Sequence, residues 1–531
     1  MTFTDSYFPA DRSEPELALT VGELLRRAAD AAPHQLALIE GTPVREKRRR
    51  WTYQELLTEA EAGARALLDR FDRGDHIAIL APNQGEWTLV QLSAALAGLV
   101  LVTVNPALRA GEVRYILDQS DSVGLVLADR YRDQDLVGVV ATVREELPNL
   151  REVIRLADWS DFVASGSESV ELPSIDPQEP AMIQYTSGTT GLPKGALLAH
   201  QGIVNAGNLI PKRIERSRGD VWLNPLPMFH TGGCVMGTLG TMASFSAQIM
   251  VTEFDPALVL QLIEEEQPTY VLGVPTMVLA LMEHPDFVSR DTSSIQVFSS
   301  GGSTVPPELV RRIEEGFRVT FNMAFGQTES SSVILMTRLD STPEQKADTL
   351  GIPLPNLELM IADENGNPVP INTQGEICCR GWGVMLGYYK MPEATAEAID
   401  ENGWLHTGDL GVMDTNGYTR ITGRIKDMII RGGENLFPRE IEDVIVMHTD
   451  VAEAAVIGVP DAKWGERPVA FVRSIGDSRP DDSDLAGFVR QRIAPHKVPG
   501  EWVFVEAFPL NAAGKIQKFI LRERYEKEHS G

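Results

Sequence analysis

Cysteine, long apolar runs and excess basic charge are all scarce in this sequence. Its 531 residues include 3 cysteines, too few for a disulfide framework or a cysteine-rich zinc cluster, so we expect a reducing compartment, the cytoplasm. The longest apolar stretch, 89–104, is shorter than the ~20 residues that span a bilayer, and it contains Gln91 and Ser93. The first residues show neither the basic start nor the apolar segment of a secretory signal, so we expect no export.

Basic residues are outnumbered, because 48 Lys and Arg face 75 Asp and Glu, and the net charge is -27. A surface this acidic repels nucleic acid, so we expect no such partner, and a bound phosphate needs a local site. Hydrophobic residues at 43% and charged residues at 23% are close to globular averages, which excludes a disordered or fibrous chain. At ~100 to 200 residues per domain, the length predicts two to four domains.

The chain changes texture along its length. From about residue 75 to 300, short aliphatic runs alternate with segments of helical periodicity, which predicts parallel sheets covered by helices on both faces. After about residue 350, short strands with Gly, Asn and Asp turns predict a β-rich subdomain. About a hundred residues remain beyond Arg424, enough for a separate small α+β domain. We predict an α/β protein with a large N-terminal domain of layered α/β sheets, 1–423, and a small C-terminal domain, 428–531.

The strongest motif runs from Tyr185 to Gly195 and reads Tyr-Thr-Ser-Gly-Thr-Thr-Gly-Leu-Pro-Lys-Gly. Glycines let backbone N–H groups converge on an anion, hydroxyls add donors, and a lysine neutralises phosphate charge. The motif lacks the Gly-Lys-Ser/Thr ending of a P-loop and runs into strand-like sequence, which excludes the usual P-loop NTPase, and a flexible linker would need no fixed lysine. We predict that a triphosphate is held by these residues: Thr186, Ser187, Gly188, Thr189, Thr190 and Lys194.

This loop resembles the hallmark of the adenylate-forming superfamily of acyl-CoA synthetases, aryl-CoA ligases, peptide-synthetase adenylation domains and firefly luciferase. Further motifs follow in the superfamily's order across about 54–518, and the look is closest to bacterial fatty-acid or aryl-acid CoA ligases. The resemblance implies that a carboxylic acid reacts with Mg·ATP to form an acyl-adenylate and that coenzyme A then takes the acyl group. ATP, Mg²⁺ and coenzyme A are the expected cofactors, and a small-molecule carboxylic acid is the expected partner.

The element Phe325-Gly-Gln-Thr-Glu329 matches a second motif of the superfamily. By resemblance, Phe325 packs on adenine, Thr328 bonds the α-phosphate, and Glu329 holds Mg²⁺, a hard cation that prefers oxygen ligands. Gly301 and Gly302 follow a predicted strand, and we expect these small residues to let the adenine ring lie against the backbone.

Asp409 ends the segment Trp-Leu-His-Thr-Gly-Asp, which resembles the superfamily's ribose element. A carboxylate is a natural bidentate acceptor for the two ribose hydroxyls, and the resemblance places Arg424 there too. Lys426 stands where relatives have the hinge between domains, so we expect a hinge at 424–427. An exposed linker lysine is the alternative for Lys426.

Two further elements are matched in the C-terminal domain. Arg431, Gly432 and Gly433 resemble the turn that lines the pantetheine tunnel of CoA-forming relatives, although a simple tight turn has the same sequence. Lys515, in a Pro-x₄-Gly-Lys pattern, is expected to bridge the acid and the α-phosphate while charge develops. The expected catalytic set is completed by two residues of the motifs above: Thr186 and Glu329.

His230, Gly232 and Gly233 belong to a segment that matches the element before the superfamily's acyl pocket. We expect these residues to bind the acid, with a buried structural histidine as the alternative for His230. The stretch 231–242 contains no acidic residue that could pair with an α-ammonium group, and burying that charge unpaired is costly. We therefore expect an apolar acid rather than an amino acid.

Other functions use parts of the same pattern. Transfer of the acyl group to a carrier protein's phosphopantetheine is the main alternative, although the acidic surface would repel an acidic carrier unless a local basic patch exists. A luciferase would need a dedicated pocket that the sequence does not reveal. A catalytically dead sensor would tend to lose Lys194, Glu329 or Lys515, and all three are present. Assembly as a homodimer is left open.

Overall fold

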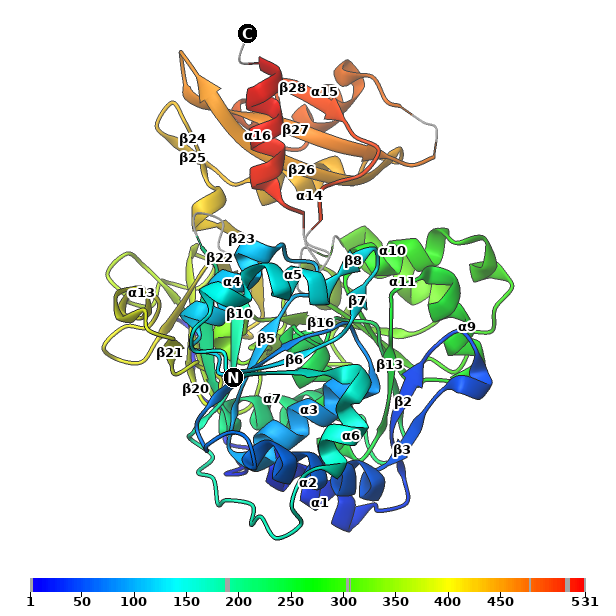
Figure 1. The fold of residues 1–531 in the computed structure, drawn as a ribbon. Helices are drawn as coiled ribbons and strands as arrows, with labels where there is room; N and C mark the ends of the chain where they lie inside the picture. The colour runs from blue at the N-terminus through cyan, green and yellow to red at the C-terminus, as the bar shows by residue number, and fades with distance from the viewer. Residues whose placement is uncertain are drawn as a thin grey trace.

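The structure is a computed structural model that describes residues 3–186, 192–301, 305, 307–476, 479–510 and 516–529, and all structural statements concern these residues. A large body carries a smaller C-terminal domain, drawn in orange and red in Figure 1. None of the helices in this part of the chain is long and apolar enough to cross a membrane.

The first sheet is parallel at its centre and antiparallel at one edge. Its strands, in spatial order, are β21 (Gly387–Tyr388), β11 (Lys194–Ala199), β10 (Pro180–Thr186), β5 (Val100–Val104), β4 (His76–Leu80), β6 (Gly124–Leu127) and β9 (Glu152–Arg155). The strands from β10 to β9 run parallel, whereas β11 is antiparallel both to β10 and to the edge strand β21. The predicted parallel sheet is confirmed, and its antiparallel edge carries the phosphate loop.

The second sheet is also parallel at its centre. Its strands, in spatial order, are β18 (Ile352–Pro353), β17 (Leu335–Met336), β16 (Thr320–Phe325), β15 (Val297–Gly301), β14 (Tyr270–Gly273), β12 (Val221–Asn224), β13 (Ala247–Val251), β2 (Leu36–Gly41) and β3 (Arg50–Thr52). Strands β2 and β3 come from the first sixty residues, so the two sheets are not consecutive segments of the chain. The sequence pattern did not predict this exchange.

Helices fill the space between the two sheets and cover their outer faces. The helix α3 (Gly85–Ala97) contacts β4 and β5 of the first sheet and β2 of the second, and it is buried all round because it lies between them. Capping boxes begin α1 (Val21–Ala31) at Thr20 and α2 (Tyr53–Leu68) at Thr52. The other helices are α4 (Ala110–Gln119), α5 (Leu136–Val143), α6 (Trp159–Ala164), α7 (His200–Arg213), α8 (Gly240–Ser244), α9 (Pro256–Glu266), α10 (Pro275–Glu283), α11 (Pro307–Phe317), α12 (Pro343–Asp348) and α13 (Pro392–Ala398).

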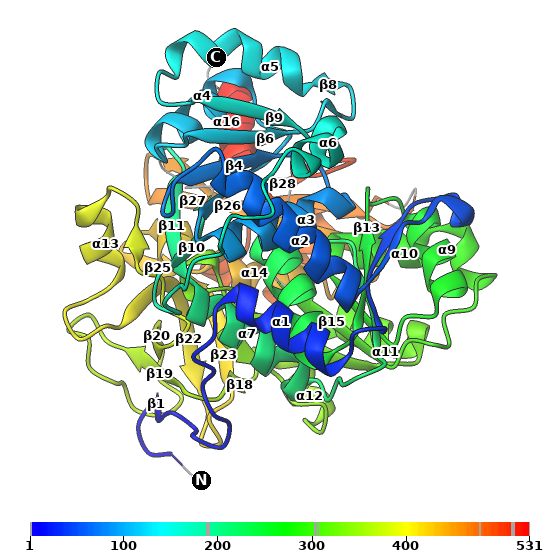
Figure 2. The same ribbon diagram turned by 60° about the horizontal axis from the view of Figure 1, so that its bottom comes forward.

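A third, antiparallel sheet forms the β-rich part that the turn-rich sequence predicts. Its strands, in spatial order, are β1 (Tyr7–Phe8), β19 (Leu357–Ala362), β20 (Gly375–Gly381), β22 (Leu405–Met413) and β23 (Thr419–Arg424). Figure 2 shows this sheet at one side of the large body, with the N-terminal segment joining it through β1. The third sheet therefore brings Asp409 and Arg424 onto neighbouring strands.

The C-terminal domain packs helices on a small sheet of its own. Its strands, in spatial order, are β25 (Glu434–Leu436), β24 (Ile429–Arg431), β27 (Gly465–Ser474) and β26 (Val451–Asp461), with β28 (Glu501–Phe504) beside β27; its helices are α14 (Pro438–Ile445), α15 (Asp482–Arg490) and α16 (Lys518–His529). The domain meets the large body where α14 contacts β23 (Figure 1). The small domain therefore sits directly over the strand that carries Arg424.

Candidate active site

The predicted phosphate loop connects two paired strands of the first sheet. Strand β10 ends at Thr186 and β11 begins at Lys194, and the two residues are partners in the antiparallel register. The Thr186 hydroxyl donates a hydrogen bond to the Lys194 carbonyl oxygen at 3.4 Å. The other predicted phosphate contacts lie outside the described residues: Ser187, Gly188, Thr189 and Thr190. The hairpin thus fixes the points where this loop leaves and rejoins the sheet.

Lys194 is joined to Glu329 through a tyrosine that the sequence analysis missed. The Lys194 Nζ lies 4.9 Å from the centroid of the Tyr388 ring, and the Tyr388 hydroxyl donates a hydrogen bond to Glu329 Oε1 at 2.7 Å. Burial and the neighbouring carboxylate raise the pKa of Tyr388, so the phenol stays protonated and remains a donor. No local motif marks Tyr388, because it reaches the site only through the pairing of β21 with β11.

The predicted adenine element lies where parallel strands of the second sheet end. Gly301 ends β15 and Phe325 ends β16, and Thr328 is buried in the short helix η6 (Thr328–Ser330) that follows. Ligands of α/β sheets bind at the carboxyl ends of such strands. A Cβ at Gly301 would lie 1.9 Å from the Ala324 carbonyl oxygen, so strand packing already requires this glycine. Gly302 lies outside the described residues.

The predicted ribose residues face each other across β22 and β23. Asp409 is only 4% exposed, and Arg424 Nε donates a hydrogen bond to its Oδ1 at 2.6 Å. The Asp409 carboxylate raises the pKa of Arg424, and Glu329 adds a smaller contribution of the same sign. Glu329, which follows the second sheet, therefore lies within electrostatic reach of the Asp409 and Arg424 pair of the third.

The predicted hinge and the predicted pantetheine turn come next in the chain, after β23. Lys426 is exposed in the short helix η7 (Ile425–Asp427) that continues β23. Gly432 and Gly433 have φ angles of +62° and +87° and join β24 to β25, which is the two-residue hairpin turn that glycine favours. The side chain of Arg431 lies over the ring of Trp464, 5.5 Å from its centroid.

Trp464 is a second residue that the sequence analysis missed. Its side chain is 42% exposed, and the Lys463 Nζ lies 4.6 Å from the ring centroid. The Gly432 N–H donates to the Trp464 carbonyl oxygen at 2.6 Å, which ties the tryptophan to the glycine turn. An exposed aromatic ring can stack on a base, and the two cations beside it can neutralise phosphate.

The predicted acyl-binding segment forms a π-helix, η4 (Gly232–Leu239), all of whose residues are buried. The Gly232 N–H donates to Nδ1 of the partly buried His230 at 3.1 Å. A Cβ would lie 2.7 Å from Leu226 Cδ1 at Gly232 and 2.2 Å from the Pro227 carbonyl oxygen at Gly233. Packing against backbone therefore requires Gly233, whereas at Gly232 the Leu226 side chain would have to shift, and contact of either glycine with substrate stays a prediction. A π-helix is rare and often marks a functional segment.

Lys515 lies outside the described residues, but the chain on either side of it is placed. Leu510 and Ile516 pair as an isolated antiparallel bridge. Lys518 forms a salt bridge with Glu442 of α14 at 2.6 Å, and α14 packs on β23. The described ends of this segment are thus anchored in the small domain.

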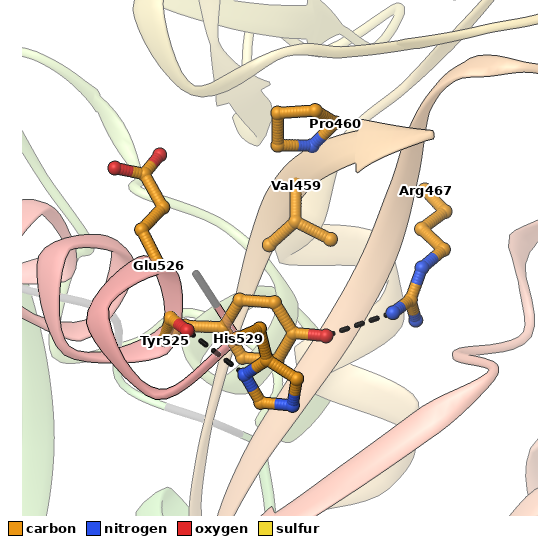
Figure 3. A pocket seen from close by; sticks show the side chains of 6 residues that line it. All are labelled: Val459, Pro460, Arg467, Tyr525, Glu526 and His529. Carbon is orange, nitrogen blue, oxygen red and sulfur yellow. Dashed lines mark hydrogen bonds between the residues drawn. The ribbon is translucent and has the colours of Figure 1, made fainter. Parts of the chain in front are cut away.

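A hollow of about 280 Å³ in the small domain involves none of the predicted site residues (Figure 3). The Arg467 guanidinium on its wall donates hydrogen bonds of 2.7 Å to the Tyr525 hydroxyl and to Glu501. The Tyr525 hydroxyl in turn donates to Glu501 at 2.6 Å. These groups satisfy one another, so the hollow offers no evident ligand site.

Comparison with known proteins agrees with this geometry. The AMP-binding enzyme family matches residues 25–389, and the AMP-binding enzyme C-terminal domain matches residues 440–515. The chain belongs to the AMP-binding enzyme family. YngI of Bacillus subtilis (strain 168), provisionally named an acyl-CoA synthetase, is 38% identical over 95% of this chain and 97% of its own length. The mitochondrial medium-chain acyl-CoA ligase ACSF2 of Bos taurus is 36% identical over 96% and 88%.

A solved structure extends the likeness to the whole fold. The structure of ATP-bound MatB from Rhodopseudomonas palustris matches with a TM-score of 0.87 and 28% sequence identity, and the match covers 96% of this chain and 100% of the MatB chain. The predicted superfamily and the predicted fold class of this AMP-binding enzyme are confirmed. The roles of individual site residues stay predictions.

Proposed function

We propose that this AMP-binding enzyme is an AMP-forming acyl-CoA ligase that activates an apolar carboxylic acid as its acyl-adenylate and passes the acyl group to coenzyme A. The acid–thiol ligase class follows from the family and from its curated relatives. The observation that carries the site assignment is the contact of Tyr388 with both Lys194 and Glu329, near enough to the hydrogen-bonded pair of Asp409 and Arg424 for the Glu329 carboxylate to act electrostatically on Arg424. Phosphate, metal and ribose chemistry are thereby offered at one place.

In the first half-reaction, the proposed work of the protein is positioning and charge neutralisation. Lys194 would contact the phosphates, and Asp409 would accept the ribose hydroxyls. Glu329 would hold Mg²⁺, because one carboxylate together with nucleotide phosphates is a common ligand set for this ion, and Tyr388 already orients the carboxylate. When bound, the ion would neutralise phosphate charge. Lys515 would stabilise the charge that develops as the acid attacks the α-phosphate and pyrophosphate leaves.

In the second half-reaction, the small domain would turn about a hinge at 424–427, between domains at 1–423 and 428–531. The turn would present Gly432 and Gly433 to the pantetheine arm. A Cβ at Gly433 would meet no atom within 4 Å, so this side of the turn is open. Arg431 and Lys463 beside Trp464 suit the phosphates of coenzyme A, and the exposed ring suits its adenine, which supports coenzyme A as the acceptor.

The proposed acid is apolar, of medium to long chain or aryl, and has no α-amino group. Within 231–242 there is no carboxylate, and residues 232–239 are all buried in η4. Burying an unpaired ammonium there would cost several kcal/mol, whereas each buried CH₂ contributes ~0.8 kcal/mol. The name of the ACSF2 relative, a medium-chain acyl-CoA ligase, supports the same choice.

The test is kcat/KM for acetate, hexanoate, dodecanoate, a cinnamate and phenylalanine, measured as AMP release with and without CoA. Hexanoate, dodecanoate or the cinnamate should lead by orders of magnitude, and AMP release should require CoA. A lead by phenylalanine or acetate would refute the pocket assignment. Equal AMP release without CoA would refute the acceptor.

We also propose the cytoplasm as the compartment, since the chain's cysteines are buried free thiols: Cys234, Cys378 and Cys379. Assembly as a homodimer stays a prediction that sedimentation would test.

A further inference from the structure

Strand β22 bulges immediately before its nucleotide-binding carboxylate. One residue of β20, Ile377, stands opposite three residues of β22, 407–409. A bulge re-aims the side chains of its strand and is frequent beside active sites. Gly408 inside it has φ +72°, a conformation that favours glycine. The direction of the Asp409 side chain therefore depends on how this bulge is held.

Two groups of the neighbouring strand hold the bulge: the Ile377 carbonyl oxygen, which accepts a hydrogen bond from the Thr407 hydroxyl at 2.7 Å, and the Glu376 carboxylate. Glu376 Oε1 accepts a hydrogen bond from the Gly408 N–H at 2.9 Å, and Oε2 pairs with His406 Nδ1 at 2.8 Å. From within the bulge, the Thr407 hydroxyl oxygen accepts the Asp409 N–H at 3.1 Å. Both oxygens of Glu376 thus bind β22 within three residues of Asp409.

We propose that Glu376 is a positioning residue for ribose recognition, which acts by fixing the bulge that directs the Asp409 carboxylate. The inference rests on the proposed function, in which Asp409 accepts the ribose hydroxyls. A carboxylate that is misplaced by about 1 Å can cost roughly 10²-fold in rate, so a distant support can matter as much as a direct contact. Alanine at position 376 leaves the Gly408 N–H without its acceptor, whereas glutamine can keep both hydrogen bonds.

Glu376 and His406, together with Cys378, have the composition of a metal site. Their hydrogen bonds and the protonation of the thiol argue against metal binding there. Among the described residues, ligand atoms of Glu376, Cys378 and His406 lie within 4.8 Å of one another. Burial raises the pKa of Cys378, which keeps the thiol protonated, while a metal ligand must be a thiolate. Both oxygens of Glu376 already have hydrogen-bond partners.

The experiment compares ATP with 2′,3′-dideoxyATP, which offers Asp409 no hydroxyl, by kcat/KM in ATP-dependent adenylation. A site built around hydroxyl contacts should prefer ATP by roughly 10²-fold or more. Asp409→Asn should reduce this preference at least tenfold, and Glu376→Ala should do the same mainly by slowing the reaction with ATP. Glu376→Gln should keep most of it. The double variant should resemble Asp409→Asn alone, because both residues act on one contact.

Glu358→Ala is the matched control, since Glu358 accepts hydrogen bonds from Arg380 and Tyr7 in the same sheet without touching β22. It should leave the ATP preference unchanged. An unchanged preference in Asp409→Asn would refute the ribose role in the proposed function. A loss in Asp409→Asn with none in Glu376→Ala would refute only the positioning role. The positioning role would also be overturned if Glu358→Ala reduced the ATP preference as much as Glu376→Ala does. Loss of the ATP preference in the unaltered enzyme after treatment with a zinc-selective chelator would overturn it too.

Discussion

Removal of the Tyr388 hydroxyl is the most direct test of the connection between Lys194, the proposed phosphate contact, and Glu329, the proposed metal ligand. Tyr388→Phe removes the 2.7 Å hydrogen bond to Glu329 and keeps the ring beneath Lys194. A hydrogen bond to a charged group contributes about 1.5–3 kcal/mol, which corresponds to roughly 10- to 150-fold in rate. We expect the Tyr388→Phe substitution to lower kcat/KM for ATP by a factor within that range. Tyr388→Leu should fall further, because it also removes the contact with Lys194.

The assay is acid-dependent exchange of pyrophosphate into ATP across a range of Mg²⁺ concentrations. If Tyr388 orients the carboxylate that holds the ion, the variant should need more Mg²⁺ for half-maximal rate. Tyr389→Phe is the matched control, because its neighbouring hydroxyl donates to Asp121 at 2.8 Å and not to Glu329. A Tyr388→Phe enzyme with unchanged rate and unchanged Mg²⁺ dependence would refute the reasoning. Equal losses in both phenylalanine variants would do so too.

Three further predictions concern other parts of the molecule. Lys515→Ala should slow adenylation by roughly 10²- to 10³-fold and spare thioester formation from preformed acyl-adenylate; equal losses in both assays would contradict its role. Lys426→Pro should instead spare pyrophosphate exchange and slow CoA-dependent AMP release, because proline fixes φ at the hinge; parallel losses would contradict that hinge. Burial lowers the pKa of His200 to about 4, below the ordinary value of 6.5, so its contribution to stability is present above pH 6.5 and is lost as the pH falls towards 4. Between pH 7.5 and pH 5, the free energy of unfolding measured in urea should therefore fall by about 2 kcal/mol less in His200→Gln than in the unaltered protein. An unchanged pH dependence would show that another group titrates.

Local periodicity predicted the layered α/β body and the β-rich part, because it reports which residues a strand or helix buries. It could not predict which sheet a strand joins. Strand β2 joins the second sheet beside β13 and brings β3 with it, β1 joins the third sheet and β21 joins the first, so β1, β2 and β21 each pair with a strand far away in sequence. These pairings depend on long-range packing, which leaves no periodic signal in the strand itself.

The candidate site divides in the same way. Residues in compact motifs, such as Lys194, Glu329 and Asp409, could be found from the sequence because several chemical groups stand close together there. Tyr388, Trp464 and Glu376 could not, since each meets its partner only after distant strands or turns have paired. The residues that orient a ligand-binding group thus carry a weaker local signal than the group itself.

The placement of the candidate site would link nucleotide binding to the proposed movement of the small domain. Lys194 and Tyr388 come from the first sheet, Phe325 and Glu329 follow the second, and the ribose pair comes from the third. Arg424 is the last residue of β23 and lies two positions before Lys426. A ligand that occupies the ribose pair therefore restrains the strand that leads into the proposed hinge. Release of that ligand would remove the restraint, so in this proposal domain orientation and nucleotide occupancy would be coupled through a single strand end.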